Sequence, residues 1–214
     1  KSFETFSTST ATTSPESRPH EERLIAAREL LEDSGWQMNA AGIYEKTDKA
    51  KKQVNLLEFA ISMPDVPELR AAAEIIKRNW EELGVSVTIK VFDTSSFTNE
   101  VLIPRKYDML FYGQVTGRLH DPYAYWHSSQ RNAPGLNLAL YINKNVDKLL
   151  EDARREPDDS ERNALLEEFR TTLQKDHPAI FLYSPEFLGS ITALSMVMVC
   201  SRPMEGSFSS CMIR

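Results

Sequence analysis

Polar and aromatic side chains crowd the segment 113–126, which directly follows the apolar run 107–113 (YDMLFYG). The candidate ligand contacts in it are Gln114, Thr116, Arg118, Asp121, Tyr123 and Trp126. A guanidinium can hold a carboxylate through paired hydrogen bonds, and aromatic rings offer large contact areas with few rotatable bonds. This combination indicates reversible recognition of a small ligand, so 113–126 is our candidate binding segment.

Some of these side chains also have a purely structural interpretation, and the sequence leaves both open. Asp121 precedes Pro122, and because Asp-Pro is a common start of a helix, the carboxylate is either a helix cap or a ligand contact. The nearby aromatic residues either wall a pocket or belong to the hydrophobic core; they are Tyr112, Tyr123, Tyr125 and Trp126.

Catalytic and metal chemistry are not indicated. The sequence has no nucleophile elbow, phosphate-binding loop or H-E-x-x-H motif. The carboxylate pairs at 158–159 and 167–168 fall where a helix cap and a solvated helix face are expected. His120 and His127 could share one face of a helix, but a metal site needs further ligands nearby. We therefore predict that the chain is not an enzyme and has no cofactor or metal.

Composition narrows the class of protein further. The net charge of −6 argues against nucleic acid as a partner, because nucleic-acid binders carry a basic face. No apolar run reaches the length of a membrane-spanning helix. The two cysteines, Cys200 and Cys211, stand close to the end of the chain, and their disulfide state stays open.

Helical and strand patterns alternate along the chain and must position the candidate segment. The expected elements are a helix from His20 to Gly35, a strand over 54–62, a helix over 67–83 capped by Asp65 and stopped by Gly84, a strand over 85–92 and a short helix capped by Asp93. They are followed by a strand over 107–113, a helix through Val146, Leu149, Leu150 and Ala153, a helix capped at Asp158 that runs through Leu165, Phe169 and Leu173, and a strand over 178–183. Such alternation predicts an α/β fold with a mostly parallel sheet flanked by helices.

Three regions differ in composition. Residues 1–19 are rich in Ser and Thr and are expected to form a flexible lead-in. Residues 20–186 hold the patterned elements and should form the folded lobe. Residues 187–214 show no sustained periodicity, so we expect an atypical, irregular tail.

Several stretches together carry a family resemblance: AARELLEDSGW (26–36), PELRAAAEIIKRNWEELGVSVTIKVFDTSSF (67–97), RKYDMLFYG (105–113), DPYAYWHSSQ (121–130), GLNLALYINKNVDKLLEDAR (135–154) and KDHPAIFLYSPEF (175–187). In order and spacing they resemble the C-terminal portion of the extracellular solute-binding proteins of ABC transporters, in the oligopeptide- and dipeptide-binding class (family 5).

The resemblance implies a two-lobed clamshell of the type II periplasmic-binding-protein kind, of which this chain is one lobe. In such a protein a peptide or similar small solute is held between the lobes, in the periplasm or at the outer face of the cell membrane. Its partners would be the missing N-terminal lobe and the permease subunits of the transporter. Metal chelates and oligosaccharides are alternative ligands within the class, and a stand-alone interaction domain or a non-functional fragment is the alternative function.

The candidate segment departs from the family pattern in one place. In peptide-binding relatives, an aspartate in this loop pairs with the amino terminus of the ligand. Here the loop has Arg118, and its one acid is Asp121. A cationic anchor favours a carboxylate or another anionic group, so a free amine is not the expected ligand group.

Overall fold

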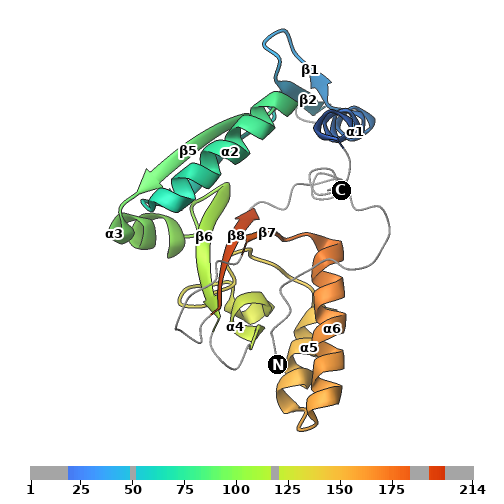
Figure 1. The fold of residues 1–214 in the computed structure, drawn as a ribbon, viewed down its shortest axis with the longest axis vertical. Coiled ribbons are helices and arrows are strands. Elements are labelled where there is room, and N and C mark those ends of the chain that lie inside the picture. Colours follow the sequence, from blue (N-terminus) through green and yellow to red (C-terminus); the bar gives the residue numbers. More distant parts are fainter. Residues whose placement is uncertain (1–18, 49–51, 117–120, 184–192, 201–214) are drawn as a thin grey trace.

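The computed structural model describes residues 19–48, 52–116, 121–183 and 193–200 (Figure 1). The first half contains α1 (His20–Asp33), β1 (Gln37–Met38), β2 (Tyr44–Asp48), β3 (Gln53–Leu56), β4 (Glu58–Pro64), α2 (Pro67–Leu83), β5 (Ser86–Phe92), α3 (Thr94–Ser96) and the π-helical turn η2 (Phe97–Leu102). The second half contains β6 (Met109–Thr116), α4 (Tyr123–Trp126), the 3₁₀ turn η3 (Ser128–Gln130), α5 (Lys144–Arg155), α6 (Asp159–Asp176), β7 (Ala179–Tyr183) and β8 (Ala193–Cys200).

A five-stranded sheet in the order β5-β4-β6-β8-β7 forms the centre of the fold. Strand β4 is parallel to both β5 and β6, while β8 is antiparallel to both β6 and β7. Strand β7 therefore runs in the same direction as β4, β5 and β6, and only β8 among these five strands runs the other way. The predicted α/β class with a mostly parallel sheet is confirmed.

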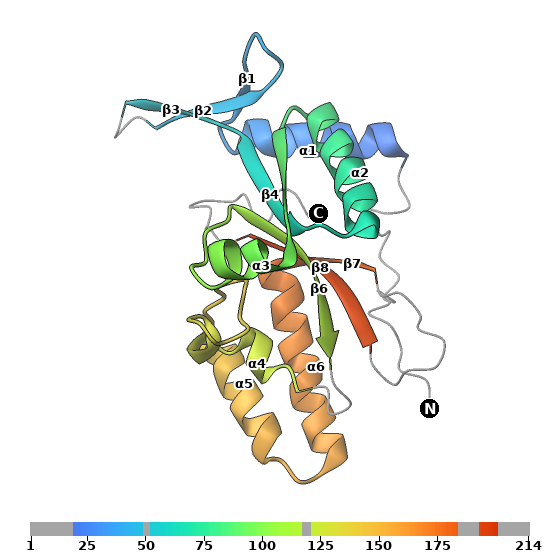
Figure 2. The ribbon, with the colours of Figure 1, turned by 90° about the vertical axis from the view of Figure 1, so that its left-hand side faces the viewer.

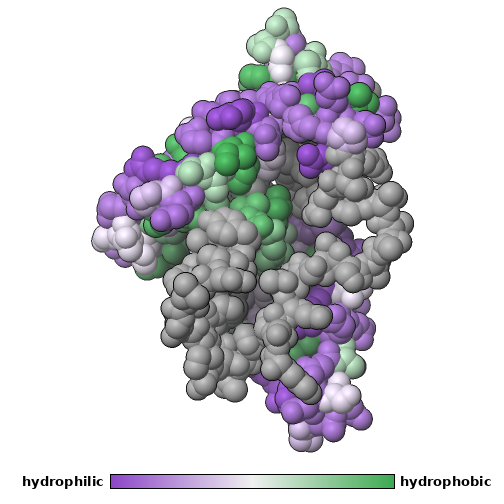
Figure 3. Space-filling model, viewed as in Figure 1, coloured by the Kyte–Doolittle hydropathy of each residue, from purple (hydrophilic) through white to green (hydrophobic). Residues whose placement is uncertain are grey.

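Helices cover both faces of this sheet and create two hydrophobic cores (Figure 2). On one face, α1 and α2 pack on the strands, with Ile61 of β4 and Phe111 of β6 fully buried. On the other face, η2, α4, α5 and α6 surround Leu110 of β6. The outward sides of α1 and α6 are mostly hydrophilic (Figure 3), as expected of helices that bury one stripe.

The residues on either side of helix α2 determine where it begins and ends. Val66 precedes Pro67 and is held extended (φ −125°, ψ 124°), so it occupies the N-cap position. Our prediction that Asp65 caps this helix is wrong, because Asp65 stands one residue too early and pairs with Arg70 at 2.8 Å. Gly84 ends the helix at φ 104°, where a Cβ atom would lie 3.0 Å from the Tyr44 ring.

The expected strand 54–62 is two strands in different sheets. Its first part, β3, pairs with β2 in a three-stranded antiparallel sheet of order β1-β2-β3 that the sequence pattern did not indicate. Leu57 separates β3 from β4 and is fully buried. Its N–H donates to the Tyr44 carbonyl and its carbonyl accepts from Ser86, so one residue joins the two sheets.

The expectation of an irregular tail over 187–214 is wrong for residues 193–200. These residues form β8, which pairs along its length with β6, from Met109–Cys200 to Thr116–Ala193. A strand with neighbours on both edges is often covered on both faces, and its apolar run then need not alternate. The expected lead-in up to residue 18 and the end of the tail from 201, which includes Cys211, lie outside the described residues.

In the described part of the chain, no helix combines the length and the apolar character that crossing a membrane requires.

Helix α6 offers a test of the local structure. The Asp158 carboxylate accepts hydrogen bonds from the amides of Ser160 (2.8 Å) and Glu161 (3.0 Å), which have no partner inside the helix. Asp158→Ala should lower the free energy of unfolding by about 1 kcal/mol in urea titrations followed by circular dichroism. Glu168→Ala, on the exposed face of the same helix, is the control and should change it by less than about 0.5 kcal/mol. Equal effects of the two variants would contradict the capping role.

Candidate functional site

The candidate segment leaves the sheet at the carboxyl end of β6. Strands β4 and β5 end together at the pair Pro64 and Phe92, whereas β6 continues beside β8 as far as Thr116. Gln114 and Thr116 lie on this extension, where their backbones pair with Ser195 and Ala193. Ligands of open α/β sheets bind at carboxyl ends of strands, so the location fits a binding segment. Arg118 lies outside the described residues.

Asp121 supports the start of helix α4. Its Oδ1 accepts a hydrogen bond from the Tyr123 amide at 3.0 Å, although Pro122 is the residue in the N-cap position. Its Oδ2 accepts from Arg154 Nε of α5 at 2.8 Å, and a second guanidinium nitrogen pairs with the same oxygen. Asp121 thus bonds to the first amide of α4 from the position before the N-cap, and its contact with a ligand stays a prediction.

The aromatic residues of the segment divide between core and surface. Trp126 is 6% exposed and packs against Tyr141 and Phe181, with ring centroids 6.3 and 5.9 Å away. The core interpretation is therefore confirmed for Trp126. Tyr112 belongs to the same core, and burial raises the pKa of its hydroxyl far above the usual range. Tyr123 is only partly buried, so part of its surface can meet a ligand.

Tyr123 lies between two cationic or polar side chains. The Arg154 guanidinium is 3.7 Å from the centre of its ring, and the His127 ring stacks on it at 4.1 Å with an interplanar angle of 15°. Arginine over a tyrosine face is an attractive cation–π contact. The ring is therefore fixed in one orientation by helix α5 and by its own helical neighbour.

His127 is buried, and the hydrogen atoms of its ring can be assigned from its partners. The Ser129 amide donates to Nδ1 at 3.1 Å, so a neutral ring carries its hydrogen on Nε2. Nε2 lies 3.4 Å from Glu151 Oε1 and 3.8 Å from Asp147 Oδ1, without hydrogen-bond geometry to either. In the part of the chain that the structure describes, no three His, Cys, Asp or Glu side chains are placed to hold a metal ion. His120 lies outside that part, so the absence of a metal stays a prediction.

Buried polar side chains that the sequence did not single out pin the loop after the candidate segment. Asn137 is fully buried; its amide donates to the carbonyls of Trp126, His127 and Tyr141, at 3.3, 3.1 and 3.0 Å. The Tyr107 hydroxyl donates to the Leu138 carbonyl at 2.6 Å, and burial raises its pKa to about 12. An asparagine in a loop has no periodicity by which sequence analysis could have found it.

Arg105 fixes the far side of the same loop. Its guanidinium donates to the carbonyls of Arg131 (3.0 Å), Leu102 (2.8 Å) and Gly135 (2.5 Å). The three acceptors come from two separate segments, so one side chain joins η2 to the loop. Arg105 and Asn137 together hold the loop that follows α4, against which the candidate segment packs.

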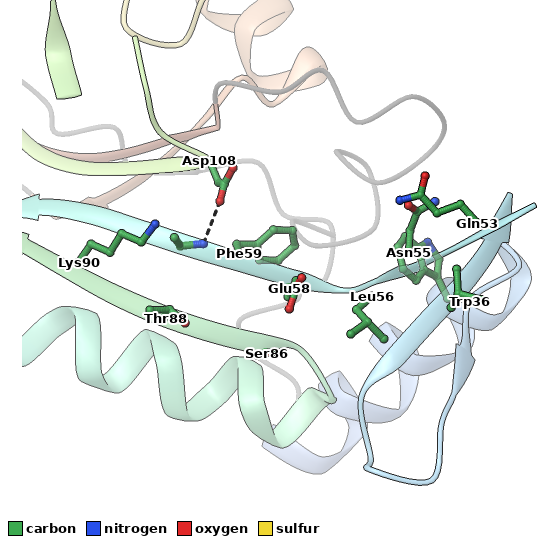
Figure 4. Close-up of a pocket in the computed structure, with 12 residues that line it drawn as sticks. Trp36, Gln53, Asn55, Leu56, Glu58, Phe59, Ser86, Thr88, Lys90 and Asp108 are labelled. Atoms are coloured by element: carbon green, nitrogen blue, oxygen red, sulfur yellow. Dashed lines mark hydrogen bonds between the residues drawn. The ribbon is translucent and has the colours of Figure 1, made fainter. Parts of the chain in front are cut away.

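A cavity of about 610 Å³ lies elsewhere, over the starts of β4 and β5 (Figure 4). Among the described residues it is lined by Trp36, Gln53, Val54, Asn55, Leu56, Glu58, Phe59, Ala60, Ser86, Thr88, Lys90 and Asp108. Asp108, which directly precedes β6, accepts a hydrogen bond from the Ala60 amide of β4 at 3.3 Å. None of the residues predicted from sequence lines it, so this cavity and the candidate segment are different places at opposite ends of the strands.

Comparison with known families identifies the chain. The family described as bacterial extracellular solute-binding proteins, family 5 Middle, matches residues 2–135. The chain belongs to this family. Family 5 proteins are extracytoplasmic solute-binding components of ABC importers and bind peptides or nickel chelates. They are not enzymes, in agreement with our prediction.

Individual relatives agree with the family assignment. The oligopeptide-binding protein AppA of Bacillus subtilis (strain 168) is 26% identical over 162 residues, which is 74% of this chain and 28% of AppA. The chain thus spans under a third of that family 5 relative. The predicted resemblance to this class of protein is confirmed.

Solved structures of family 5 proteins show the same fold. AppA from Bacillus subtilis in complex with a nonapeptide has a TM-score of 0.63 at 22% identity, covering 81% of this chain and 32% of AppA. NikZ from Campylobacter jejuni in complex with Ni(L-His) has a TM-score of 0.63 at 23% identity, covering 88% and 34%. The oligopeptide-binding protein from Thermus thermophilus with a pentapeptide has a TM-score of 0.65 at 17% identity, covering 81% and 30%.

Asn137 is the residue through which the support of the candidate segment can be tested. Asn137→Ala removes the two N–H donors that the carbonyls of Trp126, His127 and Tyr141 share, and although His127 keeps the Gln130 amide, an unsatisfied buried group costs about 1–3 kcal/mol. We expect a loss of at least about 2 kcal/mol in the free energy of unfolding, measured by urea titration. Asn132→Ala, at an exposed position of the same loop, is the matched control. An Asn137 variant as stable as this control would contradict the role of Asn137.

Proposed function

We propose that this chain is one lobe of a two-lobed binding protein that captures a peptide or similar small solute outside the cytoplasm and delivers it to an ABC permease. The observation that carries the proposal is the family match over residues 2–135. The length of the chain supports the one-lobe part of this proposal, since the chain spans 28% of AppA and about a third of the solved relatives. The expected lobe 20–186 then extends to residue 200, because β8 completes its sheet.

The proposed ligand contacts are the side chains around the carboxyl end of β6. Gln114, Thr116 and Arg118 would contact the ligand directly, and Tyr123 would form one wall of the site. Asp121 and Trp126 would act by holding the segment in shape, since one is engaged by Arg154 and the other is buried. The support for this division is the geometry of Asp121, Tyr123 and Trp126 around helix α4.

Burial between two lobes provides most of the affinity in this proposal. A ligand held against one lobe alone keeps much of its surface in water and lacks the polar partners of the other lobe. In this proposal the second wall of the site belongs to that other lobe. One lobe should therefore recognise a ligand weakly.

Calorimetry on two protein lengths tests the lobe proposal. We expect no measurable heat when the 214-residue chain is titrated with a mixture of tri- to nonapeptides or with Ni(L-His), because its site lacks a second wall. A longer protein that carries this chain together with the remaining length of its relatives should bind at least one probe with a Kd below about 1 µM. Sub-micromolar binding by the 214-residue chain alone would contradict the two-lobed model, and the absence of binding by both lengths would contradict solute capture.

The charge of Arg118 predicts which ligand group the site prefers. In the longer protein, Arg118→Gln should weaken binding of a peptide with a free terminal carboxylate by about tenfold, since charge-assisted hydrogen bonds are lost. The amidated form of the same peptide should be affected much less. Arg155→Gln, at a 72% exposed side chain on α5, is the control. Equal losses for the free and amidated peptide would contradict an anion-binding role of Arg118.

A further inference from the structure

One stripe of helix α5 contacts the end of the candidate segment and the two residues that follow it. Asp147, Glu151 and Arg154 are spaced four and three residues apart, so they share one face of the helix. The Asp147 carboxylate accepts from the amide and the hydroxyl of Ser128, at 2.8 and 2.6 Å. Glu151 faces His127, and Arg154 reaches the start of α4. The three side chains of this stripe therefore contact the chain at positions between residue 121 and residue 128.

Arg154 makes two different contacts at the end of this stripe. Its Nε donates to Asp121 Oδ2 at 2.8 Å, and its guanidinium carbon lies 3.7 Å from the centre of the Tyr123 ring. The side chains of Arg154 and Asp121 are 46% and 40% exposed, so water screens the pair and its contribution to stability is small. The contact matters instead for the charge at Asp121, which it neutralises, and for the orientation of the Tyr123 ring, which it fixes.

Both oxygens of Asp121 are engaged by these contacts. Oδ1 accepts from the Tyr123 amide, and Oδ2 accepts from Arg154. An ammonium group that approached Asp121 would meet the positive charge of the guanidinium, which already binds this carboxylate through more than one N–H. The acid of the candidate segment is thus neutralised from within the protein.

We propose that Arg154 is a positioning and selectivity residue of the ligand site: it neutralises Asp121 and fixes the ring of Tyr123, so the site discriminates against a free amino group. This inference rests on the proposed function, because it assigns a ligand preference to the same segment. Arg154 acts through Asp121 and Tyr123 and does not itself touch the ligand. The preferred ligand group beside Asp121 is neutral or anionic.

The first test compares two forms of one peptide. In the longer protein, Arg154→Met removes the charge but keeps an apolar stem over Tyr123. The ratio of the affinity for Ala-Ala-Ala to that for N-acetyl-Ala-Ala-Ala should then rise by about tenfold, because Asp121 becomes free to pair with the amine. The double variant Asp121→Asn/Arg154→Met should lose this gain. Arg154→Lys keeps the charge and should retain the wild-type preference. Arg155→Met, on the same helix, should leave the preference unchanged.

A second measurement needs no ligand. In the 214-residue chain, hydrogen exchange of the Tyr123 amide should be about fivefold faster in Arg154→Met than in Arg155→Met, because the acceptor Asp121 loses its anchor. Unchanged exchange, or an unchanged preference between the two peptides, would overturn the role of Arg154. If the wild-type longer protein bound neither peptide nor any probe of the calorimetric test, the proposed function would fail, while the exchange rate would still decide whether Arg154 holds Asp121.

Discussion

Strand β6 is buried on both faces, and the two halves of the fold depend on this one strand. Leu110 and Phe111 are neighbours in sequence and both fully buried, so they point into the two different cores. The strand also pairs with β4 on one edge and β8 on the other. Any shift of its register would move apolar side chains between the cores and break both ladders at once. The direction in which the chain leaves β6 is therefore fixed, and with it the place of the candidate segment.

Beyond the candidate segment, the loop that follows α4 is held by hydrogen bonds between its backbone and buried or partly buried side chains. Asn137, Arg105 and Tyr107 donate to carbonyls of the loop that follows α4, and Asp147 accepts from Ser128. A backbone fixed in this way can present varied side chains without changing its path, because the acceptors are carbonyls that every residue has. Two solved proteins of similar fold are in complex with different ligands, AppA with a nonapeptide and NikZ with Ni(L-His).

The sequence predicted the elements whose residues interact locally and missed those that depend on distant partners. Helix α6 begins where its Asp158 cap was expected, because a cap bonds to amides two and three residues away. Strand β8 was missed because its apolar run does not alternate and one of its two pairing strands, β6, lies far away in the sequence, as the pairs Thr116–Ala193 and Met109–Cys200 show. The break at Leu57 follows from contacts with Tyr44 and Ser86, which no local pattern encodes. Within the candidate segment, the sequence left open whether Asp121 and Trp126 are structural, and the structure shows Asp121 paired with Arg154 and Trp126 packed in the core beside Tyr141.

The charges around the segment show why a shared fold does not transfer ligand chemistry. The sheet order and the hydrogen bonds from Asn137, Arg105 and Tyr107 do not depend on the charge of Asp121, because the acceptors of these bonds are backbone carbonyls of other residues. By the family resemblance, the loop of peptide-binding relatives is expected to carry an acid for the ligand's amine, whereas this loop has Arg118, and its one acid, Asp121, is engaged by Arg154. In the proposed site these two positions act in the same direction, since each would leave no unpaired carboxylate for an ammonium group. The proposal therefore assigns the ligand preference to two independent positions, one in the loop and one on a supporting helix.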